Sequence, residues 1–174
     1  MERSKEKKLV EWSREANRGA YAELLHAYSG RVFAICLAML GNRDDAEDIT
    51  QQTLLKGFTD INQLRDDGKF GAWIGQIARN LCTDLLRGKN IEANVNIRLQ
   101  EQPKASSDEH PEMRAALKKL PREYRVALML YYFDGKSAGS VAEMLGASEM
   151  AIYARLSRAR KMLRKILESQ GDKL

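Results

Sequence analysis

Apolar residues recur at spacings of three and four along most of the chain, which is the period of an amphipathic helix. One strong stretch begins near Ala20 and ends at Gly41, and Asn42 is placed to cap the stretch that follows. Further stretches run to Phe58 and over 70–85. No repeated alternation of Val, Thr and Tyr marks a sheet. The pattern therefore predicts an all-α fold, with a charged N-terminal segment, 1–19, that frays.

Two further helices are predicted within 137–167, joined by a tight turn at Gly146 and followed by a capping Ser148. The second has an inward stripe of apolar residues, namely Ile152, Leu156, Ala159 and Leu163. Its outward side is basic, with six cations and no acid between residues 155 and 165. This pattern is typical of a helix-turn-helix that binds DNA. A solvated surface helix is the alternative interpretation.

Helical periodicity fails between Lys89 and His110, where Pro103 and neighbouring serines indicate a linker. Apolar residues from Ile91 to Leu99 mostly alternate, which fits an extended segment docked on a partner or a short strand against its own chain. We therefore expect two small helical domains, 1–88 and 111–174, joined by a flexible linker, 89–110. Its 21 residues from Asn90 span roughly 70 Å when extended, about two turns of DNA.

Net charge is distributed unevenly along the chain. Residues 111–174 contain 13 Lys and Arg against 7 Asp and Glu, whereas residues 21–60 contain 3 against 6. This asymmetry suggests nucleic acid as one partner and a basic protein surface as another. Cys36 and Cys82 stand apart on helical patterns and are expected to be packing residues in a reducing cytosol. We expect no membrane insertion, because the longest apolar run, 32–40, is far shorter than a spanning helix.

Two faces of the predicted N-terminal helices carry candidate binding residues. Asp45, Asp48, Gln51 and Gln52 share the outward face of one helix; helix-dipole complementation and solubility would equally explain them. On the next helix, Gln76 and Asn80 lie beside Trp73 and Lys69. Amides read base edges and aromatic rings stack on unpaired bases. A Trp at this spacing is more often a core residue, and a partly buried ring can also form the wall of a pocket.

The chain resembles one family closely from Ala20 to Leu167: bacterial sigma factors of the extracytoplasmic-function (ECF) type, which contain sigma regions 2 and 4. Three ordered signatures carry the resemblance: GNRDDAEDITQQTLLKGF (41–58), KFGAWIGQIARNLCTDLLR (69–87), and LPREYRVALMLYYFDGKS followed by VAEMLGAS and ARLSRARKML.

The resemblance implies three binding sites. In this family an acidic helix docks on the clamp helices of the largest polymerase subunit, which points to Asp45, Asp48, Gln51 and Gln52; region 4 meets the beta-subunit flap. Residues 64–70 with Trp73, Gln76 and Asn80, and with Lys69 inside the loop, would hold the melted minus-ten element. In the minus-thirty-five site, base contacts are expected from Tyr153, Ser157 and Arg158, and phosphate contacts from Ser148, Arg155, Arg160 and Lys161. Members commonly have Lys or Arg in place of Tyr153, which leaves the promoter sequence open.

The sequence therefore predicts a cytoplasmic bacterial sigma factor that binds core RNA polymerase and promoter DNA, and an anti-sigma factor is a further expected partner. We expect no enzymatic activity, no cofactor and no metal, because His26 and His110 lack ligand spacing. Two alternatives remain: a one-component helix-turn-helix regulator and a sigma-sequestering interaction module.

Overall fold

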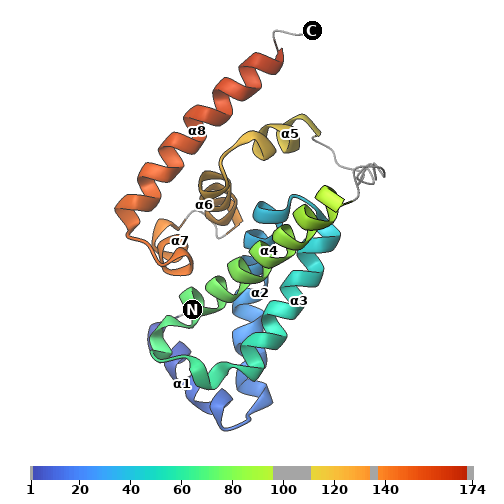
Figure 1. Cartoon of the computed structure of the whole chain (residues 1–174). Helices are drawn as coiled ribbons and strands as arrows, with labels where there is room; N and C mark the ends of the chain where they lie inside the picture. The colour runs from blue at the N-terminus through green and yellow to red at the C-terminus, as the bar shows by residue number, and fades with distance from the viewer. Residues whose placement is uncertain (1, 96–110, 134–136, 172–174) are drawn as a thin grey trace.

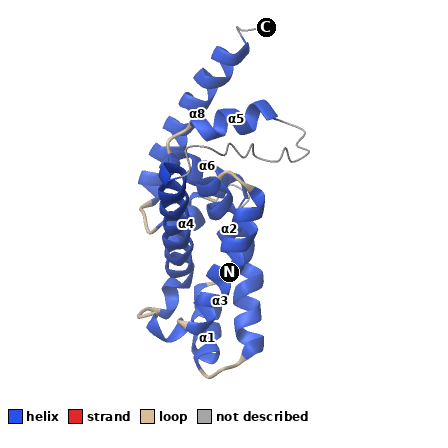
Figure 2. Cartoon of the chain, turned by 45° about the vertical axis from the view of Figure 1, so that its right-hand side comes forward, coloured by secondary structure: helices blue, strands red, loops and turns tan. Residues whose placement is uncertain are grey.

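The computed structural model describes residues 2–95, 111–133 and 137–171, and every regular element in them is a helix (Figures 1 and 2). The predicted all-α fold is thus confirmed. The elements are α1 (Arg3–Arg14), α2 (Arg18–Leu40), α3 (Arg43–Thr59), the 3₁₀ turns η1 (Ile61–Gln63) and η2 (Asp67–Lys69), α4 (Phe70–Val95), α5 (Pro111–Lys119), α6 (Arg122–Phe133), α7 (Ala138–Leu145) and α8 (Glu149–Gly171).

The prediction that the N-terminal segment frays is wrong. Residues 3–14 form α1, which packs against α2 and buries Leu9 and Val10, exposed by 3% and 0%. Glu6 is buried with them. The charge of this segment hid the apolar pair, because two buried side chains are too few to establish a helical period in twelve residues.

Helix α2 is the centre of the fold, since α1, α3, α4 and α6 all pack against it. Gly41 ends it in the left-handed conformation with φ 69°, and the Asn42 side chain then accepts a hydrogen bond from the Asp44 amide, as predicted. By length and composition alone α2 would pass as a membrane span. Ten of its side chains are buried against neighbouring helices, as in the core helix of a bundle.

The third predicted helix extends further than expected. Helix α4 continues to Val95, so the prediction that helical structure fails from Lys89 is wrong for 89–95. The proposed extended segment is therefore helical at Ile91 and Val95, whereas the part that includes Ile97 and Leu99 lies outside the described residues. Gly88 does not end the helix, because a glycine inside a helix costs only about 1 kcal/mol relative to alanine, too little to terminate it alone.

The last four helices pack on the first four and not apart from them. Helices α6 and α7 lie against α2 and α4 (Figure 1). One continuous apolar core includes Ile35 of α2, Ile74 of α4 and Met144 of α7. Two groups of helices far apart in sequence thus share a buried interface. Cys36 of α2 and Cys82 of α4 are both fully buried in this core, where their thiols interact with each other, as suits packing residues.

Candidate nucleic-acid and polymerase interfaces

Helices α7 and α8 form the predicted helix-turn-helix. The Ser137 hydroxyl accepts from the Ser140 amide to begin α7, and Gly146, at φ 61°, ends it. The Ser148 hydroxyl then accepts from the Ala151 amide at 3.2 Å, which confirms the predicted cap of α8. Ile152 and Leu156 are buried as predicted. This packing fixes which side of α8 faces solvent.

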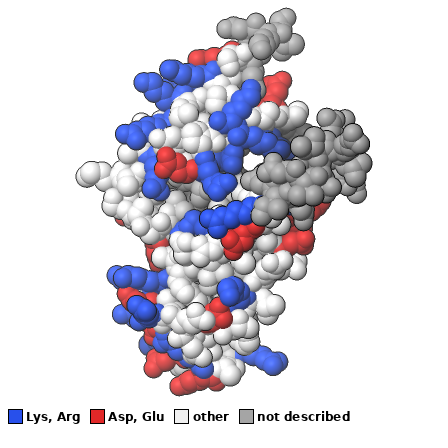
Figure 3. Space-filling model, in the orientation of Figure 1, with Lys and Arg blue, Asp and Glu red and all other residues white. Residues whose placement is uncertain are grey.

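The solvent side of α8 carries most of the residues predicted to contact the minus-thirty-five element. Tyr153 is 58% exposed and Arg155 is half-buried. Exposed with Tyr153 are Ser148, Ser157, Arg158, Arg160 and Lys161. Figure 3 shows Lys and Arg gathered over the part of the molecule where α8 lies, whereas the opposite end mixes both signs of charge. Arg160 also lies over the ring of Tyr131 in α6, 5.3 Å from its centroid, which orients it. The face is basic and accessible, as a duplex-binding surface requires.

The predicted minus-ten residues lie on a short loop and on one side of α4. Lys69, Gln76 and Asn80 are exposed. Trp73 is half-buried and packs on Phe70, with ring centroids 5.9 Å apart, so it can serve as both core and pocket wall. Phe70 is fully buried and begins α4, which anchors this face to the core.

A chain of hydrogen bonds joins that face to the helix-turn-helix. The Gln76 amide donates to Asn80 Oδ1 at 2.7 Å, and Arg79 donates to Gln76 Oε1 at 2.7 Å. A second Arg79 nitrogen donates to the carbonyl of Met144, in the last turn of α7, at 2.9 Å. Both amides predicted to read bases are therefore already engaged within the protein.

A second arginine makes the reciprocal contact. Arg125 of α6 donates to the carbonyl of Ala38, in the last turn of α2, and to the Lys118 carbonyl at 3.0 Å. The carbonyls of a last helical turn have no partner within the helix, and a cation there also complements the helix dipole. Each group of helices thus supplies an arginine that caps a helix of the other. Burial lowers the pKa of Arg79 and of Arg125, yet a guanidinium remains charged at any physiological pH.

The acidic and amide face predicted to bind core polymerase lies along α3. Asp48, Gln51 and Gln52 are exposed. Asp45 is 25% exposed and pairs with Lys89 of α4 at 2.6 Å. Because a surface ion pair contributes only about 0 to 1 kcal/mol, this contact leaves Asp45 able to exchange partners.

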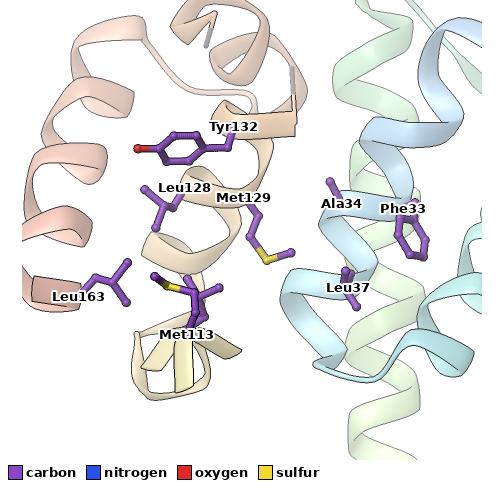
Figure 4. Close-up of a pocket in the computed structure, with 9 residues that line it drawn as sticks. Phe33, Ala34, Leu37, Met113, Leu128, Met129, Tyr132 and Leu163 are labelled. Carbon is purple, nitrogen blue, oxygen red and sulfur yellow. The ribbon is translucent and has the colours of Figure 1, made fainter. Parts of the chain in front are cut away.

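An apolar cavity of about 460 Å³ lies between the two groups of helices (Figure 4). Phe33, Ala34 and Leu37 of α2 form one wall, and the lining residues of α5, α6 and α8 form the other: Met113, Leu117, Leu128, Met129, Tyr132 and Leu163. Met113 is 40% exposed at this cavity. Two methionines in the wall give it side chains that adapt to different shapes.

Among the described side chains, no group of three or more His, Cys, Asp or Glu could hold a metal ion. The residues that sequence reasoning missed are those that connect segments: Glu6 and Arg14 of α1, and the arginine pair Arg79 and Arg125. The sequence does place Arg79 on the same helical face as Gln76, but it does not indicate the contact of Arg79 with α7. Arg125 and the α1 residues lacked any such signal.

Comparisons with known proteins place both halves of the chain in one family. The model described as sigma-70 region 2 matches residues 24–91, and that described as sigma-70, region 4, matches residues 110–163. The ECF RNA polymerase sigma factor EcfG of Rhodopseudomonas palustris is 35% identical over 147 residues, covering 81% of this chain and 80% of the relative. SigW of Bacillus subtilis, also an ECF RNA polymerase sigma factor, is 26% identical, covering 92% of this chain and 96% of the relative.

A third relative is longer than this chain. RfaY of Xanthomonas campestris pv. campestris, a probable RNA polymerase sigma factor, is 35% identical over 88% of this chain, which spans only 42% of the relative. Two solved structures share the fold. RpoE of Bartonella quintana, bound to the anti-sigma factor NepR, has a TM-score of 0.65 at 24% identity, with 85% of this chain and 96% of that one covered. CnrH, bound to the cytosolic domain of CnrY, has a TM-score of 0.67 at 21% identity, with 95% and 98% covered.

Proposed function

The chain belongs to the ECF RNA polymerase sigma factors, and from this premise we propose that it places core polymerase on promoters through two separate DNA-binding surfaces. Proteins of this family are initiation factors and not enzymes, so the chain contributes recognition while the polymerase performs nucleotidyl transfer. We place its work in the bacterial cytoplasm. The observation that carries the proposal is the capped helix-turn-helix with a basic outward face, in one chain with a region 2 domain.

On this proposal, α8 enters the major groove of the minus-thirty-five element. Tyr153, Ser157 and Arg158 face the bases, while Ser148, Arg155, Arg160 and Lys161 hold phosphates. Arg158 is exposed on the basic side of α8, which supports its assignment to a base contact. Phosphate contacts supply affinity that depends on salt, whereas base contacts supply sequence choice.

The loop before α4 and the adjoining face of that helix would hold the melted minus-ten strand. Trp73 supplies a ring for stacking, Gln76 and Asn80 supply amides, and Lys69 supplies charge. Asp45, Asp48, Gln51 and Gln52 of α3 would bind the clamp helices of the largest polymerase subunit, and region 4 would meet the beta-subunit flap. The exposure of Asp48 and both glutamines supports this assignment.

Helices α5 to α8 pack on α1 to α4 in a closed arrangement, and promoter binding must open it. Residues 96–110, at about 3.3 Å each, reach at most about 50 Å. On promoters whose two elements lie two DNA turns apart, about 68 Å, the domains must therefore move apart and contribute their own width. The Arg79 and Arg125 caps would then break, and Arg79, which stays beside Gln76 on α4, would become available to DNA. We propose that the free protein rests in the closed form and that polymerase and promoter together open it.

An anti-sigma factor would act on the same equilibrium between the closed and the open form. The two solved relatives are complexes with an anti-sigma factor and with the cytosolic domain of CnrY. The apolar cavity between α2 and α6 could receive the apolar side of such a partner and so hold both domains together. Proteins that silence this sigma factor can be selected from a genomic library in a reporter strain. They should fail against Met113→Glu; equal silencing of this variant would count against the cavity as their docking site.

Binding to purified core enzyme tests the proposal against its two alternatives. A sigma factor should co-purify with core and direct run-off transcription from specific promoters. A one-component regulator should bind duplex DNA tightly on its own and ignore core. A sigma-sequestering module should support no promoter-dependent transcription with core. Absence of core binding would therefore overturn the proposed function.

A further inference from the structure

Helix α1 lies against the loop that is proposed to hold the minus-ten strand. Arg14, at the end of α1, pairs with Asp67 through two contacts: one guanidinium nitrogen lies 3.0 Å from Oδ2 and the other 2.6 Å from Oδ1. The second nitrogen also donates to the carbonyl of Leu64. Such a two-pronged pair fixes orientation as well as distance. Arg14 thereby ties the first residue of the loop to η2.

A second contact fixes the far end of the loop. Glu6 is 2% exposed, and its carboxylate accepts a hydrogen bond from the backbone amide of Phe70, the first residue of α4, at 3.2 Å. It also accepts from the hydroxyl of Tyr28 in α2. The first amides of a helix have no partner within it, so Glu6 acts as the cap of α4 from a distant helix.

Between these two contacts, α1 covers the loop directly. A Cβ at Gly68 would lie 2.9 Å from Lys7 Cε and 3.1 Å from Arg3 Nε, so the loop backbone packs beneath the stems of two α1 side chains. Gly68 also donates to Asp66 Oδ1 at 3.1 Å, and that bond lowers the pKa of Asp66. Asp66 in turn pairs with Lys69 at 3.2 Å. Residues 64, 67, 68 and 70 are thus all held by α1.

We propose, on the basis of the function proposed above, that α1 positions the minus-ten loop, with Arg14 and Glu6 as its positioning residues. Neither residue need touch DNA. A loop ordered before the strand arrives loses less conformational entropy on binding, and its Lys69 already stands where a phosphate or base will come. The region 2 match begins at residue 24, beyond the end of α1, so this role belongs to a part of the chain that the family model does not cover.

Two variants of the full chain, assembled with core polymerase, test this inference. Arg14→Ala removes the α1 side of the Arg14–Asp67 pair, and Asp67→Asn weakens the same pair from the loop side. Electrostatics alone predicts opposite effects on DNA affinity, because the first loses a positive charge and the second a negative one. If the Arg14–Asp67 pair positions the loop, both variants should weaken DNA binding, by about tenfold as the loss of a charged hydrogen bond suggests. Lys5→Ala is the matched control, since Lys5 pairs with Glu23 of α2, away from the loop.

The probe is a forked promoter fragment with a single-stranded minus-ten region, cut from a start site mapped with wild-type holoenzyme. Affinity for core polymerase is measured in parallel, and Trp73→Ala serves as the reference for lost strand binding. We expect Arg14→Ala and Asp67→Asn to bind the forked fragment about tenfold more weakly, with unchanged affinity for core polymerase. Equal loss of core affinity, or tighter binding by Asp67→Asn, would overturn the inference. If Trp73→Ala weakens fork binding and Arg14→Ala does not, the positioning role of α1 is overturned and the proposed minus-ten site stands. If neither variant weakens fork binding, the proposed minus-ten site is overturned.

Discussion

Gly75 of α4 lies at a close contact between the two groups of helices. A Cβ at this position would lie 2.7 Å from the backbone carbonyl oxygen of Met144 in α7. A backbone atom cannot rotate away as a flexible side chain can, so α7 must shift. That shift would also stretch the bond from Arg79 to the same carbonyl, now 2.9 Å. Gly75→Ala is therefore expected to open the closed arrangement by adding a single methyl group.

Two effects of the added methyl group bear on the balance between the closed and the open form, and only one of them changes it. Inside a helix, alanine is favoured over glycine by about 1 kcal/mol, but this gain applies to α4 in both the closed and the open form and cancels. Overpacking at a tight contact costs about 1 to 3 kcal/mol, and only the closed form has the contact. A shift of about 2 kcal/mol changes the ratio of closed to open protein by about thirtyfold.

Small-angle X-ray scattering of the free protein measures this opening without labels. The variant should show a larger radius of gyration and a longer maximum dimension than wild type. Gly88→Ala is the matched control, because Gly88 lies in the same helix with no atom within 4 Å of its added Cβ. It should gain helix stability and keep the wild-type profile. If Gly75→Ala scatters like wild type, the α4–α7 contact does not hold the domains together.

Two further predictions concern the proposed surfaces, and a third concerns the stability of the fold at Glu143 of α7. Arg158→Ala should lower transcription by about 5- to 150-fold, selectively at promoters with the matching upstream element, as loss of a base contact of about 1 to 3 kcal/mol requires; equal loss at all promoters would make it a phosphate contact. Asp48→Lys should weaken core binding in a pull-down, whereas Glu11→Lys, a charge reversal at another exposed residue, on α1, should not; unchanged affinity of the first would reduce the α3 face to a solvated surface. Loss of hydration, with a smaller effect from Glu6, raises the pKa of Glu143 above its ordinary value of 4.5. The ionised form is then disfavoured on folding, so stability falls as pH rises from 4.5 through the raised pKa. Glu143→Gln should melt at a higher temperature than wild type near pH 7, and the difference should vanish near pH 4; a lower melting temperature at neutral pH would refute this.

Sequence patterns predicted the helices whose period and caps are both strong. Gly41, Asn42, Gly146 and Ser148 each act locally, through their own backbone or the next few residues, and each appears in its predicted role. The inward stripe of α8 was equally local, because burial of every third or fourth residue follows from helix geometry.

Features that depend on distant partners could not be predicted in this way. Helix α1 is stabilised by burial of Leu9 and Val10 and by the contacts of Glu6 with Tyr28 and Phe70, 22 and 64 residues away. The closed arrangement depends on Arg79, which binds a carbonyl 65 residues away. A backbone carbonyl leaves no trace in the sequence, so a bond to it has no pattern to recognise. The contact between Cys36 and Cys82 also joins distant parts of the chain, and their spacing in the sequence does not indicate it.

As a sigma factor, this chain is expected to turn core RNA polymerase into a promoter-selective enzyme. Purified core polymerase can be incubated with genomic DNA, with and without the protein, and the 5′ ends of the transcripts mapped. We predict a limited set of start sites that appear only with the protein and share two conserved elements upstream, and we predict that Trp73→Ala and Arg158→Ala remove them. Transcripts that are the same with and without the protein would contradict the account.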